Sequence, residues 1–184
     1  MQTSAEMKTM PDAQTLRANA KARLNLPLVK LTEFIALLMM GVELGVSYSH
    51  MMQLPGKLQL SLSTFIAVQT VLIKYKVGLG IVEMGSVITM VAILLLVPFR
   101  SRKFYLVLCS LVLLVLAFAV WGVFIEPINV YIDSWTTDSY PSDWNMYRER
   151  WHFLHLVRLL LLTCSTSSLV AAALIPGGYR SSDS

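Results

Sequence analysis

The stretch WHFLHLVR, residues 151–158, places groups that can exchange protons or stabilise an anion within an otherwise apolar segment. Trp151, His155 and Arg158 are spaced by four and three, so at about 100° per residue they share one face of a helix. A neutral imidazole is suited to act as a general base, and a guanidinium is suited to stabilise developing negative charge. This face is therefore a candidate site.

A second stripe with the same spacing occurs earlier in the chain, at Glu43, Ser47 and His50. Glu83 and Asn129 add polar groups to two further apolar segments at comparable depths. An ionisable residue inside a bilayer costs at least a few kcal/mol and normally faces the protein interior. The sequence therefore predicts that these side chains converge on one chamber in the outer half of a helical bundle.

The composition is that of a membrane protein, because 55% of the residues are hydrophobic and only 14% are charged. Four apolar stretches approach the roughly 20 residues that a helix needs to cross a hydrocarbon core. Backbone groups in lipid need internal partners, and without strict alternation of polar residues these stretches are expected to be helices. The sequence predicts an all-α fold, a four-helix transmembrane bundle with spans at residues 31–50, 77–99, 104–128 and 151–175.

Polar segments flank this predicted transmembrane domain, residues 31–176. Residues 1–30 are polar and mildly basic and predict a cytosolic tail, while residues 177–184 form a short C-terminal tail. Basic residues are more frequent near these ends and at residues 100–103, which favours cytoplasmic termini in a bacterial inner membrane. The expected partners are the lipid bilayer and a lipophilic small molecule. The basic flanks do not indicate nucleic acid binding.

The first outer loop is expected to contain a short amphipathic helix. It follows a Pro55-Gly56 turn and carries Phe65 and Gln69 on one face, with Gln69 turned towards the site. This helix could act as a lid over the bundle or simply pack against it. Small residues within the spans are expected where helices pack closely; they include Gly41, Gly45, Gly78, Gly85, Cys109 and Cys164.

Other interpretations of the polar residues remain open. Glu43 and Arg158 could form a buried structural ion pair. His50, His152 and His155 are candidate metal ligands, although their spacing matches no established motif, and His50 and His155 could hold a haem between them. We expect no cofactor, with a metal ion or a haem as the alternative.

Two segments resemble the anthrone oxygenase-like family of small four-span membrane proteins. EPIN and RERWHFLHLVR carry the asparagine after the third span and the Trp-x-x-x-His-x-x-Arg pattern of that family, at Asn129, Trp151, His155 and Arg158. SYSHMMQLPGKLQLS and FIAVQTVL are similar to segments of bacterial members, so the resemblance covers roughly residues 31–175. His152 is a departure, since an acidic residue is expected there.

The resemblance implies a cofactor-independent oxygenase that converts a phenolic anthrone to an anthraquinone. Glu43 or His155 would be the base, and Arg158 and Asn129 would stabilise the substrate anion. The supporting, relay or substrate-binding groups would be Ser47, His50, Gln69, Glu83 and Trp151.

Two functions follow from these observations. The first is an oxidoreductase acting on a lipophilic phenolic or quinol-like substrate in the outer half of the bundle. The second is a non-catalytic accessory or structural subunit of a larger membrane complex, in which the polar cluster holds helices or contacts a neighbouring subunit.

Overall fold

The computed structural model describes residues 13–73 and 76–175, with side chains for residues 26–71 and 78–175. The predicted C-terminal tail and residues 1–12 of the predicted N-terminal tail lie outside this part. The rest of the N-terminal tail belongs to the first helix, which begins well before the expected position 31. The elements, in chain order, are α1 (Ala13–Met52), α2 (Leu54–Lys57), α3 (Leu62–Ile73), α4 (Lys76–Leu96), α5 (Arg102–Val120), the π-helix η1 (Trp121–Ile125), α6 (Glu126–Asp133) and α7 (Trp144–Leu174).

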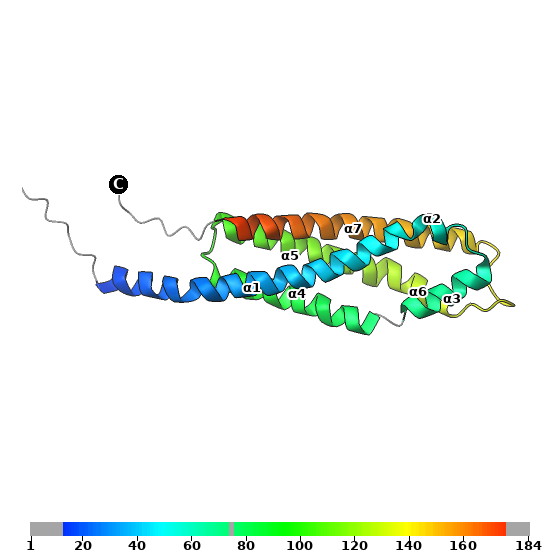
Figure 1. Ribbon diagram of the computed structural model, residues 1–184, viewed down its shortest axis with the longest axis horizontal. Coiled ribbons are helices and arrows are strands. Elements are labelled where there is room, and N and C mark those ends of the chain that lie inside the picture. Colours follow the sequence, from blue (N-terminus) through cyan, green and yellow to red (C-terminus); the bar gives the residue numbers. More distant parts are fainter. Residues whose placement is uncertain (1–12, 74–75, 176–184) are drawn as a thin grey trace, which may run out of the picture.

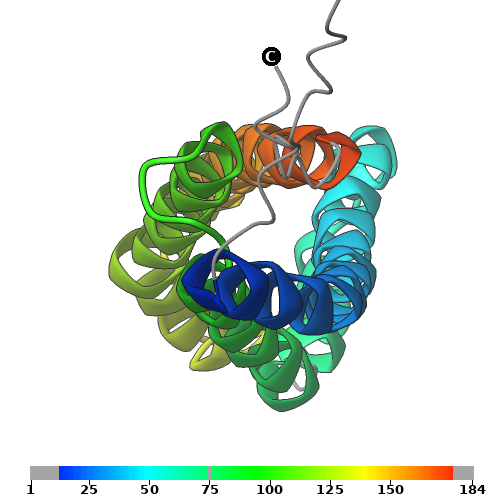
Figure 2. The same ribbon diagram turned by 90° about the vertical axis from the view of Figure 1, so that its left-hand side faces the viewer.

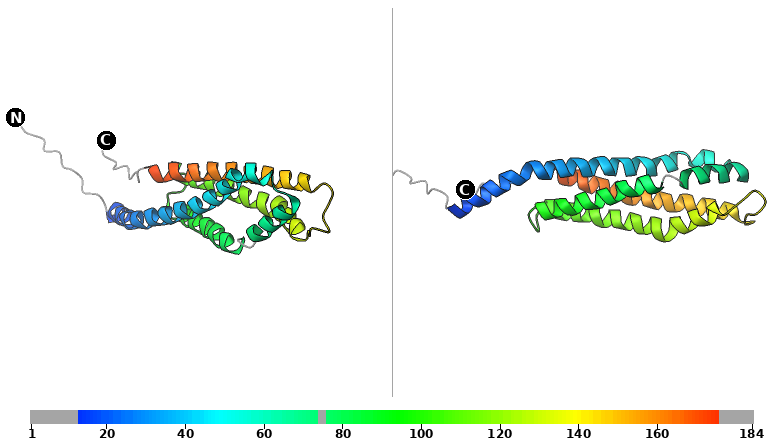
Figure 3. Two further views of the ribbon diagram at one scale, coloured as in Figure 1. Left: turned by 45° about the vertical axis from the view of Figure 1, so that its right-hand side comes forward. Right: turned by 90° about the horizontal axis from the view of Figure 1, so that it is seen from below.

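The long helices lie side by side along one axis (Figure 1). Helix α7 packs against α5 and α1, and α4 packs against α1 and α5. Viewed along the axis, the helices surround a common centre (Figure 2). The start of α1, the end of α7 and the turn between α4 and α5 are at one end, here called the turn end. Helices α2, α3 and α6 and the start of α7 are at the opposite, loop end (Figures 1 and 3).

The expected all-helical fold is confirmed for the described residues, which contain no strand beyond a single bridge between Thr136 and Ser139. Three described segments are long and apolar enough to cross a membrane: Gly78–Leu96, Arg102–Asp133 and Trp144–Leu174. These segments make the chain an integral membrane protein. The expected first span, now part of α1, is not among them.

Two apolar cores hold the bundle together, one towards each end. The turn-end core contains Met40, Met90 and Leu114, all fully buried, and nearby hydroxyl groups of Ser110 and Ser165 each donate to the other's carbonyl at 2.8 Å. The loop-end core is built largely from Phe65, Ile125, Ile128, Ile132, Trp135 and Trp151. The polar residues of interest lie between these cores.

The third predicted span continues beyond its expected end at residue 128. Pro127 lies within this continuation, where a proline has no N–H to donate and commonly ends or kinks a helix. The chain instead widens into η1, where the N–H of Glu126 donates to the carbonyl of Trp121, and then continues as α6 to Asp133. The π-type turn accommodates the proline without ending the helical path.

Helix α3 lies beyond the loop-end start of α4, at an angle to it, and packs on α6 (Figures 1 and 3). Phe65 and Gln69 are buried, whereas Ser63, Thr64 and Val71 are exposed. The exposed face of α3 therefore carries both polar and apolar side chains. As a whole, the segment Leu62–Val71 is an apolar helix.

Only one of the four glycines predicted to allow close helix packing meets a neighbouring helix. A Cβ atom on Gly85 would lie 2.7 Å from the sulfur of Met39, so α1 and α4 approach closely there. Gly41, Gly45 and Gly78 have no other atoms within 4 Å of such a Cβ. The prediction is therefore wrong for these three positions, which face open space.

Candidate functional site

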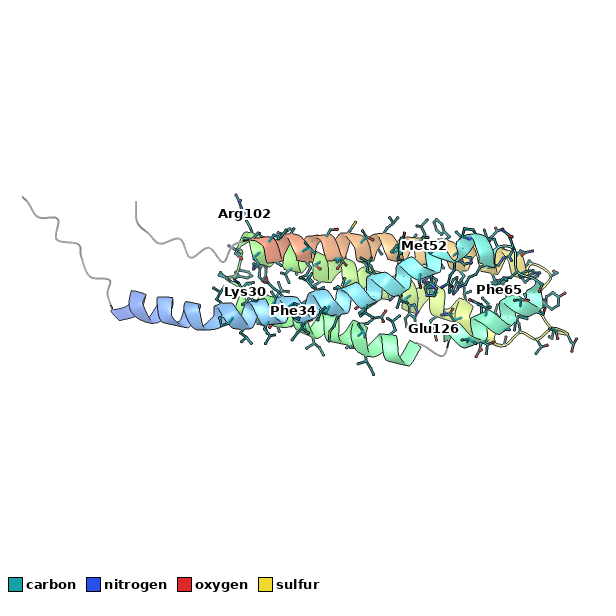
Figure 4. The ribbon with its side chains drawn as sticks, in the orientation of Figure 1. Lys30, Phe34, Met52, Phe65, Arg102 and Glu126 are labelled. Atoms are coloured by element: carbon teal, nitrogen blue, oxygen red, sulfur yellow. The ribbon has the colours of Figure 1, made fainter. Side chains whose placement is uncertain are left out.

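A cavity of about 560 Å³ lies towards the loop end, between α1, α4 and α7, with η1, α6 and α3 completing its wall. Phe65 and Glu126, labelled in Figure 4, mark the part of the bundle near it. Most of its surface is apolar. The residues expected at a site that do line the cavity are His50, Gln69, Glu83, Asn129, Trp151, His155 and Arg158.

Three rings form a contact cluster at this cavity. The centroids of Trp151 and His155 lie 4.0 Å apart, and His50 lies 4.5 Å from His155 and 5.2 Å from Trp151. The i to i+4 spacing on α7 brings Trp151 and His155 together, while His50 comes from the end of α1. The Nδ1 atoms of both histidines are buried without a hydrogen-bond partner. Both residues line the cavity, so their imidazole rings can contact a ligand there.

Asn129 fixes the orientation of the tryptophan. The indole N–H of Trp151 donates to Oδ1 of Asn129 at 2.7 Å, and Nδ2 of Asn129 donates to Glu126 at 3.1 Å. One amide N–H of Asn129 remains for a further acceptor, because a primary amide carries two donors. Asn129 thus positions the ring of Trp151 and can also present a donor to the cavity.

Arg158 pairs with Glu83, joining α7 to α4. The arginine is only 1% exposed, and its Nε has no partner. The alternative pair expected from the sequence, between Arg158 and Glu43, is not formed. The guanidinium has five donors in a fixed plane, so binding one carboxylate leaves others for a ligand.

Glu43 and Ser47 do not line the cavity, although His50 on the same stripe does. Glu43 is 1% exposed and accepts a 2.5 Å hydrogen bond from Ser86 on α4, while its second oxygen has no partner. Ser47 is fully buried, and its hydroxyl is also without a partner. Of the two bases expected from the sequence, His155 is the one in the cavity wall.

His152 faces a different side of α7. It lines a second hollow of about 260 Å³ with Met51, Leu54 and Phe153, and neither ring nitrogen has a hydrogen-bond partner. Its ring packs against Trp151 at 5.0 Å. His152 therefore lies beside the main cavity and not in its wall.

The candidate metal ligands are not arranged as a metal site. Within residues whose side chains are described, no group of three His, Cys, Asp or Glu residues could hold a metal ion. The rings of His50 and His155 are in contact at 4.5 Å, so a porphyrin plane between them would require them to separate.

Two buried cations near the cavity were not identified as site residues from the sequence. Lys57 and Arg148 are only 4% and 8% exposed. The amine of Lys57 lies 5.1 Å from the ring centroid of Trp151, and burial lowers the pKa of Lys57 to about 8. Arg148 donates to the carbonyls of Lys57 and Leu60 at 3.2 and 3.4 Å. The sequence feature that could have indicated the burial of Lys57 is its apolar surroundings in the segment LPGKL.

The family model described as "Anthrone oxygenase" matches residues 73–168, just over half of the chain. The chain belongs to the anthrone oxygenase family. The match confirms the resemblance found in EPIN and WHFLHLVR. No curated protein and no solved structure matches the chain significantly.

The matched part of this anthrone oxygenase family protein extends from the end of α3 into α7. It contains six of the expected site residues, of which five line the cavity and His152 does not; the five are Glu83, Asn129, Trp151, His155 and Arg158. The α1 stripe lies outside the match. Of the three residues in that stripe, His50 is the one that lines the cavity together with residues of the matched segment.

Proposed function

We propose that this protein is a membrane oxygenase that oxidises a lipophilic phenolic, anthrone-like or quinol-like molecule. The observation that carries the proposal is the largely apolar cavity in which an imidazole and a guanidinium converge. Its volume of about 560 Å³ lies within the range of small-molecule sites. A flat, apolar molecule with one or two polar oxygens fits these surroundings.

In this proposal α1 also crosses the membrane, which brings the number of transmembrane helices to four. Both termini are on the cytoplasmic side of a bacterial inner membrane. The outward face of α1 supports its assignment as a span, since Leu31, Phe34 and Leu38 are each more than half exposed. Such a row of exposed apolar side chains is stable in lipid and unfavourable in water. The cavity then lies in the outer half of the bilayer.

The proposed base is His155, which removes a proton from the acidic methylene carbon of the substrate. Arg158 and the free amide N–H of Asn129 donate to the enolate oxygen that forms. The ring of Trp151, held by Asn129, provides a flat apolar wall for the substrate. Glu83 orients Arg158 through their ion pair.

The electron-rich carbanion then reacts with dioxygen. One oxygen atom becomes the new ketone, and the other leaves as water with the two hydrogens of the methylene group. This conversion of a methylene to a carbonyl is a four-electron oxidation, which one molecule of dioxygen balances. No metal ion or organic cofactor is needed in this scheme.

The test is oxygen uptake and quinone absorbance with a hydroxylated anthrone, using purified protein in detergent and subtracting the protein-free rate. We expect His155→Gln to lower kcat/KM by about 10²–10⁴-fold, which is typical for loss of a general base. His152→Gln is the matched control, because His152 is buried on the same helix beside the other hollow. It should change the rate less than about threefold.

The opposite results would reject the proposal. An unchanged rate in His155→Gln would exclude this residue as the base. Oxidation no faster than the protein-free rate, together with co-purification of partner proteins that is lost in Glu83→Gln, would instead identify the chain as a non-catalytic subunit.

A further inference from the structure

One wall of the cavity is formed where α1 faces the first turns of α4. Val42 and Val46 contribute from α1, and Gly78, Leu79 and Val82 contribute from α4. Val42 lines the cavity and is 51% exposed, and Gly78 on α4 is also exposed. Because these lining residues remain accessible, no further layer of side chains covers the cavity wall between the two helices.

The outer surface at this position is apolar. Gly78, Leu79 and Val82 belong to the segment Gly78–Leu96, which is itself a candidate membrane span. Exposed side chains around the wall include Leu38 on α1 and Ile81 on α4, at 56% and 71%. The surface between α1 and α4 therefore faces hydrocarbon and not water.

The loop end of the cavity is partly covered, with the exposed side chain of Gln53 left in its wall. The fully buried Phe65 of α3 packs with the loop-end core, and Arg148 of α7 holds the carbonyls of Lys57 and Leu60. These contacts fasten the segment that connects α2 and α3 across the loop end. The approach left at this end passes the polar side chain of Gln53, whereas the approach between α1 and α4 is lined by Val42, Val46, Leu79 and Val82 and is apolar.

We infer that the cavity is filled sideways from the bilayer, through a lateral opening between α1 and α4 at Gly78. The ligand is a lipophilic small molecule dissolved in the hydrocarbon, as the proposed function requires. Gly78 leaves this opening free, because no atom lies within 4 Å of the position that a Cβ would occupy. A larger side chain there would project into empty space at the cavity wall.

A thiol inside the cavity tests this route without any catalytic turnover. Ser49 lines the cavity, so Ser49→Cys introduces a reporter of nearly the same size. Cys109 and Cys164 were expected to be packing residues, but both are exposed on membrane-spanning helices, so they report how much reagent enters the bilayer. Labelling at each cysteine is followed by peptide mass spectrometry in phosphatidylcholine vesicles.

N-phenylmaleimide and a charged methanethiosulfonate are the two probes. Relative to the native cysteines, N-phenylmaleimide should label Cys at position 49 readily, and Gly78→Leu should slow that reaction at least tenfold. Gly45→Leu is the matched control, since Gly45 is an exposed helical glycine with open space around it and does not line the cavity. It should leave the labelling rate within about twofold.

Val42→Trp provides a second obstruction if Gly78→Leu does not fold, because Val42 is half exposed and can accept a larger side chain. It should also slow N-phenylmaleimide at least tenfold. Unchanged labelling in the folded obstructed variant would overturn the inference, as would equally fast labelling by the charged reagent from water. Because the readout needs no oxygenase activity, failure of the proposed chemistry would leave this result interpretable.

Discussion

Lys57 is the most unusual single residue at the loop end, because its amine is buried without a hydrogen-bond partner. The titratable and charged groups that face it are His50, His152, His155 and Arg148, none of which is a carboxylate. The ring of Trp151 provides partial compensation through a cation–π contact. Burial favours the neutral amine and so lowers the pKa of Lys57 from 10.5 to about 8.

This pKa predicts that Lys57→Met stabilises the protein. Below pH 8 the folded protein must hold a buried ammonium; a shift of this size corresponds to an upper limit of about 3–4 kcal/mol, which screening by nearby water reduces. Between pH 8 and 10.5 the folded state loses the proton while the unfolded state keeps it, so the cost falls as pH rises. The variant should therefore unfold at a higher temperature than the wild type at pH 7, with the difference shrinking towards pH 10.5.

The measurement is thermal unfolding in detergent over this pH range. Lys103→Met is the control, because Lys103 forms a 2.7 Å ion pair with the buried Glu33. Removing that lysine leaves a carboxylate without its partner and should lower stability. If Lys57→Met also lowers stability at pH 7, the amine has a stabilising partner and this account of Lys57 is wrong.

Contacts between elements depend on which side chains reach the same level of the bundle. Glu83 on α4 and Arg158 on α7 meet there, and this pair joins two of the membrane-spanning segments. Both charges are removed from water when the helices pack, so burying either charge without the other is unfavourable. The pair therefore acts as one unit in the packing of α4 on α7.

Double replacement should reveal this coupling. We expect Glu83→Leu alone to lower the free energy of unfolding by about 3–5 kcal/mol, since it leaves Arg158 buried and unpaired. Arg158→Met alone should have a similar effect, whereas the combined variant should recover most of the loss. Chemical unfolding in mixed micelles measures the cycle. Glu149→Leu is a control, because Glu149 is exposed on α7 and should shift stability by no more than about 0.5 kcal/mol. Additive losses would show that the two charges do not stabilise each other.

The helical spacing on α7 was predictable because all three residues of its stripe belong to one straight element. Trp151, His155 and Arg158 do share the cavity wall. The stripe on α1 divides, with His50 at the cavity and Glu43 against Ser86. A sequence gives the angle between side chains on one helix, but it does not give the tilt of that helix against its neighbours.

The ends of the helices were less predictable than their apolar centres. Helix α7 begins at Trp144 and not at 151, because the polar residues of its first turns pack against the loop end; Arg148, for example, holds two carbonyls there. The third predicted span continues past Pro127 because the π-helix η1 precedes it, and local helix propensity does not indicate this π-type turn. The partner of Arg158 likewise depended on relative depth, which only the assembled bundle fixes.

The two ends of the molecule differ in how many of their basic side chains are exposed. Basic residues flank the predicted spans on both sides in the sequence. Among the basic residues at the loop end whose side chains are described, Lys57 and Arg148 are buried and Arg150 is exposed, so only Arg150 is available to interact with lipid headgroups. Arg100 and Arg102 at the turn end are exposed (Figure 4 labels Arg102). The surface charge therefore favours a cytoplasmic turn end more strongly than the residue count does.

Single cysteines at the two ends test this orientation in a version of the chain with Cys109→Ala and Cys164→Ala. Arg102→Cys reports the turn end and Asp138→Cys reports the loop end, and both positions are exposed. A membrane-impermeant maleimide should label position 138 in intact cells and position 102 only after the cells are opened. Labelling of both from outside would mean that the helices joining them do not cross the membrane. The reverse pattern would place the turn end on the outer face of the membrane, together with the start of α1 and the end of α7. The cavity would then lie in the cytoplasmic leaflet.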